Sequence, residues 1–101
     1  MIAQSWIPCG YQQITSLTAA TALTVPTTGA AAASGSLVAV IVCEAQNVRW
    51  RDDGTAPSAT VGMLMQTGDP PLEYSGDLAA LQFIQATASA KLNVSYYRVP
   101  L

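Results

Sequence analysis

The stretch that decides the fold is LVAVIVCEAQNVRWRDDGTAP, residues 37–57. It opens with an unbroken apolar run (37–43), resumes after a polar break with VRWR (48–51), and ends on Asp, Gly and Pro. Short runs rich in β-branched residues predict strands, and Asp-Gly followed by Pro predicts a turn. We therefore expect strands at 37–45 and 48–51, then a turn at 52–58 from which the chain returns beside the second strand.

Similar segments follow one another along most of the chain, separated by Gly, Pro, Asp and Ser. About eight short strands in a chain of this length fit two packed sheets or a small barrel. The sequence therefore predicts an all-β fold, a compact antiparallel β-sandwich of the Ig-like or jelly-roll-like kind. The expected strands are 12–17, 21–25, 37–45, 48–51, 60–65, 71–74, 80–86 and 91–99.

The length of 101 residues fits one domain. We expect it to cover residues 12–101, behind an N-terminal arm at 1–11. Period-two alternation in the last strand places Leu92, Val94 and Tyr96 on one face. The run 37–43 is apolar on both faces, which is typical of a strand buried on both sides or facing a partner chain.

The composition is poor in charge. Charged residues make up 10% of the chain, against about 25% in ordinary soluble domains. A surface depleted of Lys and Glu resembles the centre of a protein–protein interface, although an ordinary neutral surface is the alternative. The net charge of −2 and the lack of a basic run exclude nucleic acid as an expected partner.

No membrane partner is expected either. The longest apolar run, 37–43, is far shorter than the roughly 20 residues needed to cross a bilayer. The N-terminal residues carry no basic segment followed by a long apolar one, so we expect no export signal and synthesis in a cytoplasm.

The chain lacks the usual equipment of an enzyme or a metalloprotein. It has no His, no GxSxG, no SxxK and no phosphate-binding loop. Cys9 and Cys43 lack the CxxC spacing of a zinc or redox site, and whether they are bonded stays open. The adjacent carboxylates of Asp52 and Asp53 are too few for calcium and diverge on an extended chain. We expect no catalytic residue, no metal and no cofactor.

Four of the ten charged residues fall within five positions: Arg49, Arg51, Asp52 and Asp53. The two arginines share one face of their strand. Each can pair with either aspartate or with Glu44, through directed bidentate bonds that fix geometry even where they add little stability. We interpret this group as a structural turn that also touches a neighbouring subunit, and the sequence leaves open whether its pairs lie within or between chains.

VRWRDDGTAPSATVGMLM (48–65), followed by PLEYSGDLAALQFIQATASAKLNVSYYR (71–98), resembles a pattern in small proteins of about this length encoded by tailed bacteriophages. The segment ATALTVP (20–26) also fits the front of that pattern, so the resemblance covers most of 12–98, and only the arm at 1–11 matches nothing. It implies a virion structural protein with a β-sandwich core and no catalytic residue.

The expected function is a head decoration or minor capsid protein that stabilises the shell in many copies. The resemblance and the charge-poor surface imply the major capsid protein or other virion proteins as partners. They also imply a homo-oligomer, with a trimer favoured at three-fold points of the lattice. Its location would be the virion, assembled in the host bacterial cytoplasm. A neck, tail or fibre-adaptor component is the first alternative.

Candidate contact residues divide into two groups. Trp6, Ile7 and Pro8 of the arm form the first, because Trp is enriched at binding hot spots, although Trp6 can instead pack on its own domain. The charged turn described above is the second. A glycan- or receptor-binding module is a further alternative, and it would use exposed aromatic residues beside polar ones, such as Tyr97 next to Asn93 and Ser95.

Overall fold

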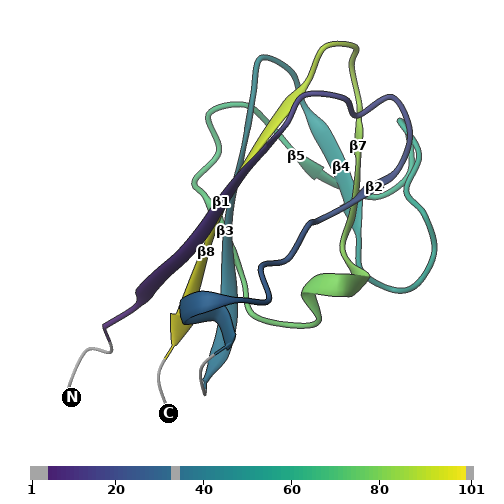
Figure 1. The fold of residues 1–101 in the computed structure, drawn as a ribbon. Helices are drawn as coiled ribbons and strands as arrows, with labels where there is room; N and C mark the ends of the chain where they lie inside the picture. The colour runs from purple at the N-terminus through teal and green to yellow at the C-terminus, as the bar shows by residue number, and fades with distance from the viewer. Residues whose placement is uncertain (1–4, 33–34, 100–101) are drawn as a thin grey trace.

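The computed structural model describes residues 5–32 and 35–99, and these form eight β-strands and two short 3-10 turns (Figure 1). The strands lie in two four-stranded antiparallel sheets that pack face to face, which confirms the expected all-β sandwich. The elements are β1 (Ile7–Ile14), β2 (Thr21–Ala22), η1 (Gly29–Ala32), β3 (Ser36–Glu44), β4 (Val48–Arg51), β5 (Met63–Met65), β6 (Leu72–Tyr74), η2 (Leu78–Ala80), β7 (Gln82–Gln85) and β8 (Lys91–Val99).

The strand order identifies the type of sandwich. Sheet A has the order β1-β8-β3-β6 and sheet B the order β2-β7-β4-β5. The first strand therefore pairs with the last, the second with the seventh, the third with the sixth and the fourth with the fifth. Such nested pairing is that of one long hairpin rolled into two sheets, so the fold is an eight-stranded jelly roll.

β8 is one of the two central strands of sheet A and lies between β1 and β3. Its inward side chains are Leu92, Val94 and Tyr96, each at most 1% exposed, as the alternation predicted. Sheet B contributes Val48 and Phe83 to the same core. Alternation along extended strands thus fills the space between the sheets with apolar groups from both.

The prediction of an N-terminal arm over residues 1–11 is wrong for residues 7–11, because these residues belong to a strand of sheet A. β1 begins at Ile7, which lies opposite Arg98 of β8, and continues to Ile14. The part of the arm before residue 5 lies outside the described residues. Ile7 and Pro8 are therefore part of sheet A and not of a free anchor.

Pro8 and Gly10 are the reason that the sequence pattern misplaced this strand. Both residues normally interrupt strands, and they moved the expected start to residue 12. β1, however, is an edge strand, where a missing N–H is tolerated, and a β-bulge between Pro8 and Gly10 absorbs the irregularity. Leu17, expected to end this strand, lies beyond it and is fully buried.

The other expected strands occur at the predicted places, most of them shorter. The segment 21–25 is a strand only over its first two residues, and 60–65 only over its last three. Gly62 has φ +141°, outside the range of an extended L-residue, which explains why β5 starts after it. Before β7, Asp77 accepts a hydrogen bond from the Ala79 N–H and caps η2.

Cys9 and Cys43 are both free thiols, Cys43 buried in the core and Cys9 partly exposed. Among the described residues there is no helix long and apolar enough to span a membrane.

A matched pair of substitutions tests the assigned core. Leu92→Ala removes a side chain that is fully buried, so we expect a loss of about 2–5 kcal/mol in the free energy of unfolding. Leu64→Ala makes the same change where the side chain is 45% exposed, and we expect a change within about 0.5 kcal/mol. Urea unfolding of both variants measures the difference. Equal losses would contradict the assigned faces.

Candidate functional site

The charged bend, comprising Arg49, Arg51, Asp52 and Asp53, lies where β4 leaves sheet B. β4 ends at Arg51, and the turn that follows contains Gly54 at φ +86°. That positive φ is what the Asp-Gly signal predicted, because glycine adopts it without strain. β5 then returns beside β4, as expected.

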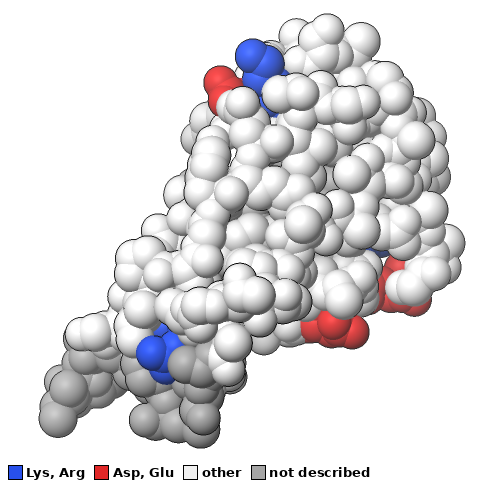
Figure 2. All heavy atoms as spheres, in the orientation of Figure 1, with Lys and Arg blue, Asp and Glu red and all other residues white. Residues whose placement is uncertain are grey.

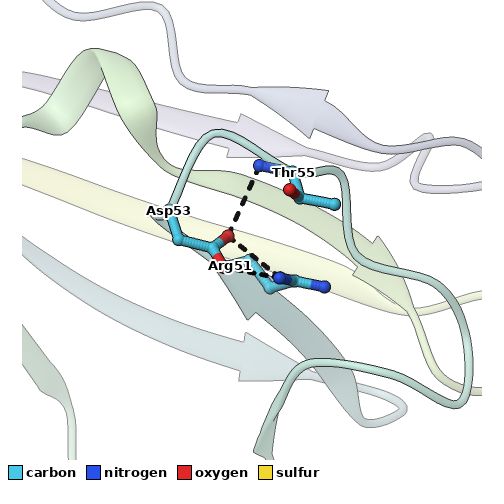
Figure 3. Close-up of polar contacts among 3 residues, drawn as sticks. All are labelled: Arg51, Asp53 and Thr55. Carbon is cyan, nitrogen blue, oxygen red and sulfur yellow. Dashed lines mark hydrogen bonds and ion pairs between the residues drawn. The ribbon is translucent and has the colours of Figure 1, made fainter.

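Arg51 and Asp53 form a bidentate ion pair within the bend (Figure 3). The Arg51 Nε donates to Asp53 Oδ1 at 3.0 Å, and Nη2 donates to the other carboxylate oxygen. Asp53 Oδ1 also lies 3.4 Å from the Thr55 N–H. The hydrogen bonds from Arg51 hold the pKa of the Asp53 carboxyl below its usual value. In this exposed position the pair fixes the shape of the turn more than it stabilises the fold.

Arg49 binds main-chain carbonyls and pairs with neither aspartate. Its Nε donates to the Ala59 oxygen at 3.1 Å and its Nη1 to the Gly62 oxygen at 2.9 Å. One guanidinium thus holds both ends of the segment that leads into β5. Gly62 is required at this point, because an added Cβ would lie 3.1 Å from the Trp50 oxygen and 3.3 Å from Arg49 Cβ.

Asp52 connects the two sheets. Its Oδ2 accepts a hydrogen bond of 2.6 Å from the Tyr74 hydroxyl, which belongs to β6 at the edge of sheet A. The Tyr74 ring packs edge-on against Trp50 of β4, with ring centroids 6.2 Å apart. The hydrogen bond to Asp52 raises the pKa of Tyr74 to about 12, because it stabilises the protonated phenol.

All four charges of the bend thus have partners inside their own chain. These partners are carbonyl oxygens for Arg49, the Tyr74 hydroxyl for Asp52, and Arg51 and Asp53 for each other. Glu44 pairs with neither arginine and instead accepts a hydrogen bond from Asn93 Nδ2 at 2.8 Å.

Next to the bend lies a surface that the sequence did not single out. Val61, Met63 and Leu64 are 54%, 59% and 45% exposed. With Arg51, Asp52 and Asp53, Val61 and Met63 line a shallow hollow of about 260 Å³. We call Val61, Met63, Leu64, Arg51 and Asp53 together the β5 edge surface.

The exposure of these apolar residues follows from the strand order. β5 is an edge strand of three residues, so nothing covers its outer side among the described residues. Met63 lies opposite Trp50, on the face of sheet B that points into the sandwich, but at the open margin of the fold. Gly62, directly before the short apolar segment 63–65, was the only signal in the sequence.

The remaining candidates lie on sheet A. The Trp6 ring packs on Tyr97, with centroids 5.5 Å apart, and Pro8 lies opposite Tyr97 in the β1–β8 pair. Trp6 therefore contacts its own domain, the alternative that the sequence allowed. Among the described residues, no hydrogen bond, ion pair or ring contact connects Trp6 or Tyr97 to the charged bend.

The surface offers few charged groups for chemistry. On the face seen in Figure 2, most of the area carries neither acidic nor basic side chains. Within residues 5–32 and 35–99, no group of three or more acidic or Cys side chains is close enough to hold a metal ion. The site is an exposed apolar patch beside charged side chains that hydrogen bonds hold in place.

Comparison with protein-family models, with curated proteins and with solved structures finds no match for this chain.

Replacing Arg51 by Gln tests the ion pair of the bend. In the native chain we expect the pKa of Asp53 below that of an unpaired aspartate, and in Arg51→Gln we expect it to return to the ordinary range. Any stability from this pair is present above the ordinary carboxyl pKa and lost as the pH falls through the lowered value. Carboxyl NMR titration measures the change, and an unchanged pKa would contradict the pairing.

Replacing Asp52 by Asn tests the link between the sheets. We expect the pKa of Tyr74 to be about 12 in the native chain and closer to the ordinary tyrosine value of 10.0 in Asp52→Asn. Stability from the raised pKa is present below pH 10 and lost as the pH rises through about 12. Because burial also raises the pKa of Tyr96 to about 12, NMR titration of the assigned ring signals of Tyr74 follows the transition. Tyr74 titrating alike with and without Asp52 would exclude the bond.

Proposed function

We propose that this protein is a structural component of a bacteriophage virion, most specifically a head decoration or minor capsid protein that binds the assembled shell through the β5 edge surface. The observation that carries the proposal is the exposure of Val61 and Met63 in a hollow whose other wall is charged, with the exposed Leu64 next to Met63 on the same edge strand. Exposed apolar groups inside a polar margin are the arrangement of protein–protein contact sites.

The bend suits this role because its charges are already fixed. Arg51 and Asp53 hold each other, and Arg49 holds the loop that carries Val61. A contact surface that is rigid before binding loses less conformational entropy on association. The apolar side chains then need only a complementary apolar surface on the partner.

Two further observations support a virion component. The resemblance of residues 48–65 and 71–98 to small phage-encoded proteins points to it directly. The eight-stranded jelly roll also recurs in viral capsid proteins, an argument from fold analogy alone. The partner on this view is the major capsid protein, or another virion protein, with further copies of this chain around it as a homo-oligomer, such as a trimer.

We choose the β5 edge surface over the N-terminal residues for geometric reasons. Ile7 and Pro8 are part of β1, and Trp6 is engaged with Tyr97. None of them extends from the domain as an anchor. Val61, Met63 and Leu64, in contrast, lie at the margin of sheet B, where a neighbouring subunit has access.

Binding to particles that lack the chain tests the proposal. We expect the purified protein to bind such shells, and Met63→Asp to weaken binding at least about tenfold, since it introduces a charge into an apolar contact. Thr87→Asp is the matched control, because it adds the same charge at an exposed turn between β7 and β8 and should bind as the native chain does. Sedimentation with the shells gives the bound fraction. Equal binding by both variants would contradict this surface.

The position in native particles tests the finer assignment. Decoration requires density for this chain at repeated lattice positions over the shell. Density confined to the portal vertex or the tail would replace decoration by a neck, tail or fibre-adaptor role. Absence from the particle would refute the virion proposal as a whole.

A further inference from the structure

The outward face of sheet A is a second surface of distinct chemistry. Strand pairing sets Val38, Tyr97 and Pro8 in one row across β3, β8 and β1. Val38 is 5% exposed but lies outside the core cluster, on the opposite side of the sheet from Ala39. Something on the outer face must therefore cover it.

Val38 also lines a hollow beside Trp6. A depression of about 380 Å³ is lined by Trp6, Ser36, Val38, Glu73, Ser75 and Val99. Its volume falls in the range of about 300–1,000 Å³ typical of small-ligand sites. The contact of Trp6 with Tyr97, at 5.5 Å, fixes the orientation of the aromatic wall.

The lining combines one aromatic wall, an apolar floor and three oxygen-bearing side chains. Ser36 and Ser75 can each donate and accept a hydrogen bond, and the two oxygens of the Glu73 carboxylate can accept hydrogen bonds from the hydroxyls of a ligand. There is no Lys or Arg in the lining, so an anionic ligand would meet a carboxylate without a compensating cation.

A polar network lies farther along the same face of sheet A. Tyr11, 66% exposed, donates to Asn93 Oδ1 at 2.6 Å. Gln13 Nε2 donates to the same oxygen at 3.0 Å and lies 3.2 Å from Glu44 Oε1. These bonds hold the amide and carboxylate groups in fixed positions across three strands before any ligand arrives.

From these features we propose that the outward face of sheet A binds a neutral hexopyranose oligosaccharide. One sugar ring lies with its C–H face on Trp6, and its hydroxyls bond Glu73, Ser36 and Ser75. Tyr97 and Asn93 are four residues apart on β8, about 13 Å at about 3.3 Å per residue. That distance lets the chain of sugars extend from the hollow to Tyr11, so oligosaccharides should bind more tightly than single sugars.

This site is independent of the β5 edge surface. Its residues belong to β1, β3, β6, β8 and the segments beside them, all of sheet A, whereas Met63 and Leu64 belong to sheet B. Shell binding and saccharide binding can therefore succeed or fail separately.

Titration of the full chain with defined sugars tests the proposal. The probes are gluco-, galacto-, manno- and N-acetylglucosamine hexasaccharides, the four corresponding monosaccharides, and tetramethylammonium as a cationic probe. Calorimetry and tryptophan fluorescence in a Trp50→Phe background report binding, so that the fluorescence signal comes from Trp6. We expect at least one hexasaccharide to bind at submillimolar concentration and its monosaccharide to bind more weakly.

Three variants locate the site. We expect Trp6→Ala and Glu73→Ala each to weaken binding about tenfold or more, and Tyr11→Ala to weaken only the hexasaccharide. Glu73 is exposed, so its variant keeps the test valid if loss of Trp6 disturbs the sheet. Thr87→Ala, at an exposed position in the turn between β7 and β8, is the control and should bind as the native chain does.

Several results would overturn the proposal. One is failure of all the hexasaccharides to bind at millimolar concentration. Another is native affinity in both Trp6→Ala and Glu73→Ala. A response to tetramethylammonium without a response to any sugar would assign the hollow to a cation instead, as aromatic and carboxylate groups together also permit.

Discussion

The structure depends on the insertion of β8 between β1 and β3. β8 is formed by the last described residues, and it pairs with one strand from the start of the chain and another from the middle. Its inward side chains, Leu92, Val94 and Tyr96, meet those of sheet B across the core. Because these contacts are distant in sequence, the sandwich closes only when the two ends of the chain come together, and folding of such topologies is expected to be slow.

The same rolled pairing decides which surfaces remain uncovered. A jelly roll made of nested pairs has two sheet edges at the innermost hairpin end, and here β5 is one of them. Sheet B is held to sheet A at this margin by the hydrogen bond from Tyr74 to Asp52. The bend therefore serves the fold first, and the apolar residues beside it are exposed because β5 has no further strand outside it.

The fold class and the pattern of the core could be predicted from the sequence, because alternation in 91–99 and the apolar run at 37–43 are local signals. The start of β1 could not, since Pro8 and Gly10 are tolerated only by an edge strand with a bulge, and edge position is a property of the whole sheet. For the same reason the pattern located the charged bend but missed Met63 and Leu64, which look like core residues until β5 is found at an edge.

The low charge of the chain limits the kinds of contact that its surface can make. In the charged bend, Arg51 and Asp53 neutralise each other, and Arg49 and Asp52 carry opposite charges, so the bend adds little net field to the surface. Contacts made by this protein must then rest on shape, apolar area and hydrogen bonding, which salt screens weakly. Such contacts suit a permanent place in an assembly, and they also suit an uncharged ligand, because neither requires long-range attraction. The two sheets can thus carry two different contacts without electrostatic interference between them.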